Sequence, residues 1–357
     1  MTAPGTIDVH AHFLPEGDPP AAVTESFRDV PRVVRDSSTS GRVVRGDVDF
    51  RTVRSSLWNL SDRLAEMDAA GIGVQVISPM PVALDYQAPP KAFAAYCRWV
   101  NDAIAAAVRD SQGRLCGLGT LPLADPERLV QELDYLHFDL GLSGVEIGTR
   151  IAGMDLDDAR LHGFFAAAQR LGMAILVHPV DGGGGAIRRG GFVYNFGLGM
   201  PSDTALAASA LVFGGVLERF PALRIAMVHG CGTFTWAYPR LRMGAKIART
   251  HDLEQLDRNL ARLYVDTLVF DPDDLRLLVQ RFGTERLLVG SDHPFVPGQP
   301  DGSLKDLAEM APNLESEAMS RILRTNALEF LGLPVTPGAQ DPGSPSTHEP
   351  ATASIKG

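Results

Sequence analysis

The chain has 357 residues, of which 45% are hydrophobic, and its formal net charge is −10. This length is enough for a large core but long for one domain unless it is a barrel, and the acidic balance without a Lys/Arg-rich run argues against nucleic acid as a partner. Three scattered cysteines without a CxxC spacing favour a reducing cytoplasm. The N-terminal stretch lacks a charged region followed by an apolar one, and the apolar runs are short, so we expect a soluble protein with neither a signal peptide nor a transmembrane helix.

The first predicted element is a strand at the start of the stretch "TIDVHAHFLP", residues 6–15. Ile7 and Val9 favour a strand, and Pro15 ends the pattern. Successive side chains of a strand point to opposite faces, so His10 and His12 share one face. Two imidazoles on one face at the carboxyl end of a strand are half of a metal site. This stretch alone leaves open the alternative of two polar residues in a loop.

Seven more strands are predicted, in the order "GVQVISP" (73–79), "LCGLGTLPL" (115–123), "GVEIGT" (144–149), "MAILVHP" (173–179), "LRIAMVHG" (223–230), "LYVDTLV" (263–269) and "RLLVGSDHP" (286–294). Helical patterns such as 56–71 and 158–172 separate them. Strand and helix alternating eight times predicts an α/β fold of the (β/α)8 barrel type. A doubly wound open sheet is the alternative, in which the outer strand ends would lie too far apart to share one site.

The barrel is expected to occupy residues 1–334, with two segments outside its regular pattern. Residues 16–62 form an insertion after the first strand, and residues 335–357 form a tail rich in Pro, Ser, Thr and Gly that we expect to be disordered. The glycine-dense stretch 181–192 is interpreted either as a mobile flap over the end of the fifth strand or as a loop without a role.

Polar residues that can bind a metal stand at four predicted strand ends. His178 ends the fifth strand, His229 the sixth and Asp292 the eighth, in addition to the two histidines of the first. A lone histidine at a strand end is more often structural, but four strand ends of one barrel converge on one pocket. Three imidazoles and one carboxylate suit Zn²⁺ or a similar divalent ion with a position left for water. The flexible Gly-Cys-Gly that follows His229 leaves its ring accessible, so we assign it to acid–base chemistry rather than to the metal.

Several motifs in chain order resemble one known family. They are "IDVHAHFLP", "FRTVRSSLWN", "GLGTLPL", "GVEIGT", "HPVDG", "GMPSDTALA", "GGVLERFPALRIAMVHGCGTF" and "LVGSDHPF". Together they are similar to the amidohydrolase superfamily, and most to its aminocarboxymuconate-semialdehyde decarboxylase branch, over roughly residues 6–333. The resemblance implies a metal-dependent (β/α)8 barrel that usually holds Zn²⁺ and is often a dimer. Binuclear members have a lysine at the fourth strand, which "GVEIGT" lacks, so one metal per chain and no organic cofactor are expected.

The resemblance also implies roles for particular residues. It makes His10, His12, His178 and Asp292 the metal ligands, and His229 with Asp292 the catalytic groups. It implies substrate contacts from Arg51, which would bind a carboxylate, from Arg240, which would reach the neighbouring subunit's site, and from Phe196 and Phe295. The chain departs from the family at Val180, Phe196 and His293, where Trp, Trp and Tyr are common, so the exact substrate stays open.

A metal, a histidine and arginines in one pocket suit a substrate that carries carboxylates. We therefore expect a metal-dependent non-oxidative decarboxylase, a carbon–carbon lyase, acting on a carboxylated muconate semialdehyde similar to 2-amino-3-carboxymuconate 6-semialdehyde or on a related aromatic-derived acid. The nearest alternative is a hydrolase or hydratase that uses the same site. A non-catalytic binding barrel is the third possibility, and the complete set of ligands argues against it.

Overall fold

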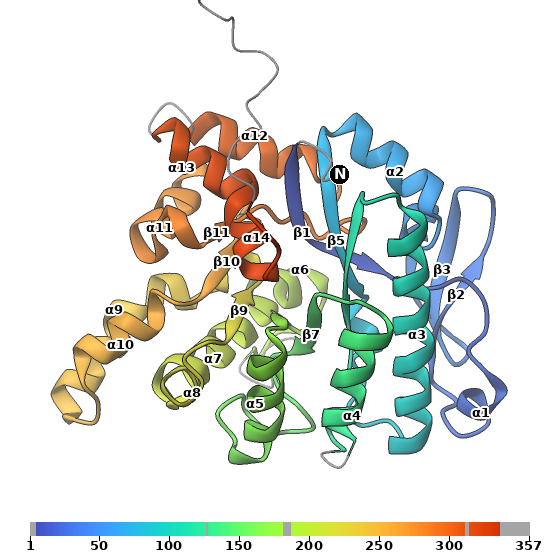
Figure 1. Cartoon of the computed structure of the whole chain (residues 1–357), viewed down its shortest axis with the longest axis horizontal. Helices are drawn as coiled ribbons and strands as arrows, with labels where there is room; N and C mark the ends of the chain where they lie inside the picture. Colours follow the sequence, from blue (N-terminus) through green and yellow to red (C-terminus); the bar gives the residue numbers. More distant parts are fainter. Residues whose placement is uncertain (1–4, 126–127, 181–186, 311–313, 336–357) are drawn as a thin grey trace, which may run out of the picture.

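A computed structural model describes residues 5–125, 128–180, 187–310 and 314–335. Eight strands form one parallel sheet that follows the chain order (Figure 1): β1 (Thr6–Phe13), β5 (Ile72–Pro79), β6 (Leu115–Gly119), β7 (Gly144–Gly148), β8 (Ala174–His178), β9 (Arg224–Met227), β10 (Tyr264–Asp266) and β11 (Leu287–Leu288). Parallel bridges from Asp8 to Val289 and from Ala11 to His293 join the last strand region to the first. The predicted (β/α)8 barrel is therefore confirmed.

Helices surround this sheet (Figure 1). In chain order they are α2 (Leu60–Ala69), α3 (Pro90–Asp110), α4 (Leu129–Asp134), α5 (His162–Leu171), α6 (Phe192–Tyr194), α7 (Met200–Phe213), α8 (Val216–Arg219), α9 (Phe234–Ala248), α10 (Leu253–Leu260), α11 (Pro272–Phe282), α12 (Asp301–Met310), α13 (Ser316–Ser320) and α14 (Asn326–Leu331). One apolar cluster joins Ile7, Leu176 and other strand residues to Phe330 of α14, and a larger one joins the strands to most of the other helices. Burial of these apolar faces stabilises the barrel.

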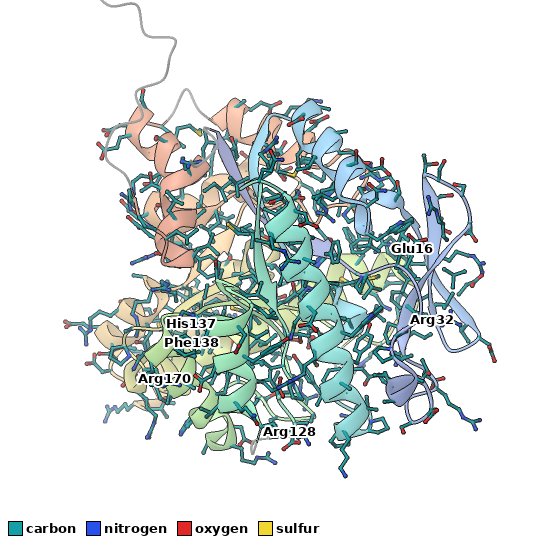
Figure 2. The ribbon with its side chains drawn as sticks, turned by 45° about the vertical axis from the view of Figure 1, so that its right-hand side comes forward. Glu16, Arg32, Arg128, His137, Phe138 and Arg170 are labelled. Carbon is teal, nitrogen blue, oxygen red and sulfur yellow. The ribbon has the colours of Figure 1, made fainter. Side chains whose placement is uncertain are left out.

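The segment 16–62 contains a small sheet of its own beside the barrel. It holds α1 (Ala21–Thr24) and the antiparallel strands β2 (Pro31–Arg35), β3 (Ser40–Arg45) and β4 (Val48–Arg54). Figure 2 shows Glu16 and Arg32 at this sheet, on the side of the molecule away from α5. Val33, Val43 and Val53 are buried and attach the sheet to the main core. The segment runs into the first turn of α2, where the Asn59 side chain accepts a hydrogen bond from the main-chain N–H of Asp62.

Some strands are shorter than the apolar runs that predicted them. The run 115–123 gives a strand only as far as Gly119, and the run 286–294 gives the two residues of β11. Pro122 lacks the N–H that a ladder needs. After Leu288 the eighth strand continues as isolated bridges at Val289 and His293, on either side of Asp292 with its φ of +54°. Of the two segments expected to be mobile or disordered, 181–186 and 336–357 lie outside the described residues.

One helical stretch, Phe192–Phe213, is long and apolar enough to cross a membrane by length and composition alone, which the sequence analysis had not expected. Within it, Ala207, Ala208 and Leu211 of α7 are buried in the main core. A core helix of a globular protein has the same composition, and α7 packs against α9 in this way.

Candidate metal centre

Four side chains meet at the carboxyl ends of the barrel strands. They are His10 and His12 of β1, His178 at the end of β8, and Asp292, and one donor atom from each lies within 4.8 Å of the others. The Nε2 atoms of the three histidines are buried; those of His10 and His178 have no hydrogen-bond partner among the described residues, and that of His12 lies 3.0 Å from Asp292 Oδ1. Each such orphaned polar atom costs about 1–3 kcal/mol. A divalent cation would satisfy all three at once, so the residues present fit a bound metal.

Hydrogen bonds at the other ring nitrogen orient these histidines. His10 donates from Nδ1 to the Asp266 carboxylate at 2.7 Å. His12 and His178 donate from Nδ1 to main-chain carbonyl oxygens at 3.1 and 2.7 Å. With the hydrogen on Nδ1, each imidazole has a lone pair on Nε2, which is the tautomer that a metal ligand needs.

The electrostatics of the cluster favour the ligand forms of His178 and Asp292, whereas the acidic groups near His12 outweigh burial and raise the pKa of that imidazole. Burial, reinforced by the neighbouring histidines, holds the pKa of His178 well below its ordinary value. Burial raises the pKa of Asp292, but its interactions with His12 and His229 and the charge of His10 outweigh burial, so the pKa of Asp292 is well below its usual range. Around neutral pH the site therefore offers a neutral imidazole and a carboxylate, as a divalent ion requires.

His229 lies beside the cluster on the turn His229–Cys231 that follows β9. Its Nε2 is 3.9 Å from Asp292 Oδ2, and its ring centroid is 5.1 Å from that of His178. The turn holds His229 at a φ of +54° and Gly230 at +58°. A Cβ on Gly230 would lie 2.4 Å from Val269 Cγ1, so this turn needs glycine. Left-handed non-glycine residues are uncommon and cluster at functional sites, and both His229 and Asp292 have this conformation.

A cavity of about 610 Å³ opens onto His178 and Asp292. Arg51 of β4 lines it because the β3–β4 pairing contains a bulge: Val43 pairs with Arg51 while Val44 pairs with Asp49, which leaves Phe50 as the extra residue. Both Phe50 and Arg51 line the cavity, although successive strand residues normally face opposite ways. The bulge therefore adds a guanidinium to the cavity that His178 and Asp292 line.

Arg51 is held against Phe295, which also lines the cavity. Its Nη2 donates to the Phe295 carbonyl at 3.0 Å, and its guanidinium carbon lies 4.6 Å from the centre of the Phe295 ring. The Phe295 ring lies 5.5 Å from that of His12. Burial lowers the pKa of Arg51, opposed by the charge of Asp292. Desolvation of this kind strengthens a charge-assisted bond to an anion that enters the cavity.

A second cavity, of about 440 Å³, borders His229. Phe196 and Met200 line both cavities. Phe196 packs between Phe192 and Phe270, with ring centroids 5.4 and 5.8 Å away. Two predicted site positions lie elsewhere. Arg240 is on the exposed side of α9 and lines neither cavity, and the buried His293 contacts Arg63 and Glu66.

Comparison with known proteins identifies the family. Residues 7–333 match the model of the Amidohydrolase family. The chain belongs to this family. This amidohydrolase is 31% identical over 337 residues to the 2-amino-3-carboxymuconate-6-semialdehyde decarboxylase of Dictyostelium discoideum, which covers 92% of this chain and 91% of that protein. It is 27% identical over 355 residues to the Caenorhabditis elegans protein of the same name, covering 82% of this chain and 86% of the relative. The crystal structure of apo Metarhizium anisopliae IDCase superposes with a TM-score of 0.75 at 24% identity, over 92% of this chain and 97% of that one.

Two buried acids at this amidohydrolase site were missed from the sequence. Asp266 ends β10 and contacts His10, as described above. Glu146 lies in β7, and its carboxylate is 3.7 Å from His12 Nδ1. Burial is the largest cause that raises the pKa of Glu146, to about 7. The available signal was a single acidic residue inside an otherwise apolar strand, which is unusual because buried acids need a partner.

A buried polar network supports the strand that carries two of the histidines. Arg63 of α2 is fully buried and donates to the His12 carbonyl and, at 2.6 Å, to Gln75 Oε1. Gln75 donates in turn to Asp8 at 2.8 Å, and Asp8 accepts from the main-chain N–H of His10 at 3.1 Å. Hydrogen bonds to charged groups are among the stronger ones, so this network restrains the backbone of β1 around its two histidines.

Proposed function

We propose that the protein is a metal-dependent non-oxidative decarboxylase of a carboxylated muconate semialdehyde, similar to 2-amino-3-carboxymuconate 6-semialdehyde, or of a related aromatic-derived acid. The observation that carries this proposal is the cluster of His10, His12, His178 and Asp292, of which the last two line the same cavity as Arg51. The names of the two curated relatives support the substrate class. For the metal we propose one Zn²⁺ per chain, because three imidazoles and a carboxylate are ligands that suit it.

In this proposal the metal, Arg51 and His229 have separate roles. When bound, the metal supplies Lewis-acid polarisation of a substrate oxygen. Arg51 binds a substrate carboxylate and fixes the orientation of the molecule, with Phe196 and Phe295 against its conjugated carbons. When the bond to the departing carboxylate breaks, CO₂ leaves and the electron pair stays on the ring or chain carbon. His229 transfers a proton to that carbon, so the balance closes without an organic cofactor.

A screen of carboxylated semialdehydes and hydroxybenzoates tests the activity. For a decarboxylase we expect one CO₂ released for each substrate lost, measured together with the change in absorbance. Loss of substrate with no CO₂ would instead identify a hydratase or hydrolase at the same site. Elemental analysis of the purified protein tests the metal: about one zinc per chain supports the proposal, and another divalent ion at full occupancy contradicts the choice of zinc.

Replacement of Arg51 with alanine is expected to raise KM about 10- to 100-fold for the dicarboxylate substrate. A hydrogen bond to a charged group contributes about 1.5–3 kcal/mol, and each 1.4 kcal/mol is about tenfold in affinity. Arg54→Ala is a matched control on the same strand, because Arg54 pairs with Glu66 at 3.3 Å and does not line the cavity. Steady-state kinetics compare the two variants. An unchanged KM in Arg51→Ala, or an equal change in both, would show that the carboxylate is bound elsewhere.

We also propose a homodimer in which Arg240 completes the partner's site. The exposed apolar side chains of α9 support this: Trp236, Met243 and Ile247 are 72%, 52% and 76% exposed. With Arg240 they recur at positions 236, 240, 243 and 247, which share one side of a helix. An apolar stripe of this kind is typical of a surface that another protein covers. A second copy of the chain that covers this surface would bury the stripe and place Arg240 against the site of that copy.

Mixing two inactive variants tests the shared site. Arg240→Ala and His229→Ala should each be inactive alone and should regain activity after subunit exchange. In a mixed dimer one site has both residues intact, so recovery approaches about a quarter of the parent activity if half of the dimers are mixed. Subunit exchange is verified with differently tagged chains. No recovery in verified mixed dimers, or a fully active monomer at assay concentration, would exclude the shared site.

A cytoplasmic location is proposed on chemical grounds. Cys97, Cys116 and Cys231 are free thiols in this structure. Free thiols and no disulfide among the described residues are usual in a reducing compartment. Fractionation of cells that express the tagged protein tests the location directly.

A further inference from the structure

Among the three histidines of the candidate metal centre, His10 is the one whose orientation depends on a side chain. His12 and His178 donate from Nδ1 to the main-chain carbonyl oxygens of Pro79 and Pro179. His10 donates instead to Oδ2 of Asp266, at 2.7 Å. A main-chain carbonyl oxygen is present whatever the side chain at its position, whereas the acceptor for His10 is lost if Asp266 is replaced.

The same carboxylate also holds the turn that carries His229. Asp266 is 1% exposed, and its Oδ1 accepts the main-chain N–H of Gly230 at 3.0 Å and that of Leu268 at 3.2 Å. Gly230 follows His229 directly and shares its left-handed backbone conformation. The hydrogen bond to its N–H therefore restrains the left-handed turn that carries the His229 ring.

Close packing fixes the carboxylate in this bridging position. A Cβ added to Gly290 would lie 2.7 Å from the Cβ of Asp266, so only glycine at position 290 leaves room for it. Asp266 packs directly against Gly290, and each of its two carboxylate oxygens accepts from different donors. Buried carboxylates that are fully hydrogen-bonded are rigid parts of a site.

We propose that Asp266 is a positioning residue with two simultaneous functions: it sets the tautomer in which His10 binds the metal, and it holds the turn that aims His229 at the substrate. This inference rests on the metal centre and the role of His229 proposed above. The positions of both His10, the proposed metal ligand, and His229, the proposed proton donor, then depend on the carboxylate of Asp266.

The chemistry of the carboxylate explains the first function. An ionised carboxylate accepts hydrogen bonds and cannot donate them. Nδ1 of His10 must then carry the hydrogen, which leaves the lone pair on Nε2, the buried atom that faces the cluster. Orientation of a ligand histidine by a carboxylate is worth about 10- to 100-fold in metal affinity.

Asp266→Asn separates this role from simple packing, because it keeps the shape and changes one acceptor into a donor. If the amide oxygen stays on Gly230 and Leu268, the NH₂ group faces His10 and forces the hydrogen onto Nε2, where it blocks the metal. If the amide flips, the NH₂ group faces two N–H donors and the turn loses its acceptor. The first orientation leaves every hydrogen bond of the amide satisfied, whereas the second leaves two buried main-chain N–H groups without an acceptor. The first is therefore favoured, and metal binding is the function that we expect to be lost.

The test compares the parent protein, Asp266→Asn and the control Asp203→Asn. Asp203 is another buried aspartate, which accepts a hydrogen bond from the Thr149 hydroxyl. Zinc affinity, measured by competition with a chelator, should fall about 10- to 100-fold in Asp266→Asn and stay within about twofold of the parent in Asp203→Asn. Thermal unfolding of the metal-free proteins shows whether each variant is folded. A folded Asp266→Asn variant with the zinc affinity of the parent would overturn the proposal.

A second measurement needs no variant at position 266 to fold. The ¹⁵N shifts of histidine side chains in the metal-free parent report which ring nitrogen carries the hydrogen, and the His10 signal is assigned by its loss in His10→Gln. The proposal requires hydrogen on Nδ1 in the parent, and hydrogen on Nε2 would overturn it. Neither readout involves turnover, so failure of the decarboxylase assay leaves the role of Asp266 to be decided by these results.

Discussion

His178→Ala is expected to purify with little bound metal and to catalyse decarboxylation about 10³-fold more slowly or worse, since a catalytic metal lowers the activation barrier by several kcal/mol. The His178 Nε2 is a buried imidazole nitrogen without another partner among the described residues. Its removal takes away one of the four proposed ligands, so the affinity of the site for zinc falls. Elemental analysis of the variant and the rise of Tm with added zinc measure the loss, because a ligand that binds only the folded state raises Tm.

A histidine far from the centre provides the control. Figure 2 labels His137 next to Phe138 on the outer helical layer, and His137→Ala should keep the metal content, the zinc-dependent rise in Tm and the activity of the parent. The double variant His10→Ala/His178→Ala is the stricter experiment. Full metal occupancy in that double variant would mean that the ion binds somewhere other than this cluster.

The convergence of the four proposed ligands could be predicted from the sequence because it depends on few physical rules. The i, i+2 spacing of His10 and His12 fixes their common face, and the carboxyl ends of parallel strands meet at one end of a barrel. His178 and Asp292 each follow an apolar run that forms a buried strand or bridge. Strand periodicity and fold topology therefore place these donors together, whatever the precise length of each strand.

The support around the ligands could not be found in the same way. Asp266 and His10 are 256 residues apart, and nothing in the stretch "LYVDTLV" shows which histidine the acid contacts. The position of Phe50 and Arg51 depends on a bulge in the pairing with β3, which is set by the partner strand rather than by the local pattern. Arg63 has the periodicity of an ordinary helix residue, although its guanidinium is buried against β1.

The departures from the family pattern acquire a physical meaning in this structure. Phe196 borders both cavities, so a change of ring at this position alters the shape of the substrate site. Val180 lines the larger cavity, where a valine in place of Trp leaves more room above the ligands. His293 is buried against Arg63 and Glu66, so its exchange for Tyr changes the support of β1. Substrate choice therefore depends on the first two positions more than on the third.

His229→Ala is expected to keep its metal and to lose about 10²- to 10⁴-fold in kcat, the usual contribution of a positioned acid or base. His229 Nε2 is 3.9 Å from Asp292 Oδ2, beside the proposed metal centre, but His229 is outside the group of four whose donor atoms lie within 4.8 Å of one another. Proton transfer to the carbon that loses CO₂ then has no side-chain donor in the variant. Elemental analysis and single-turnover kinetics, measured on the same preparation, separate metal loss from a slower chemical step.

The backbone at this position determines which second variant is informative. His229 has a φ of +54°, a conformation that asparagine tolerates better than alanine, so His229→Asn retains the turn with less strain. Both variants should bind zinc as the parent does and should be equally slow, because neither side chain exchanges protons near neutral pH. Added imidazole should restore part of the rate in His229→Ala, where the removed ring leaves space beside the 440 Å³ cavity. A metal-free His229→Asn protein would mean that His229 is a metal ligand. A kcat close to that of the parent in either variant would mean that another group transfers the proton.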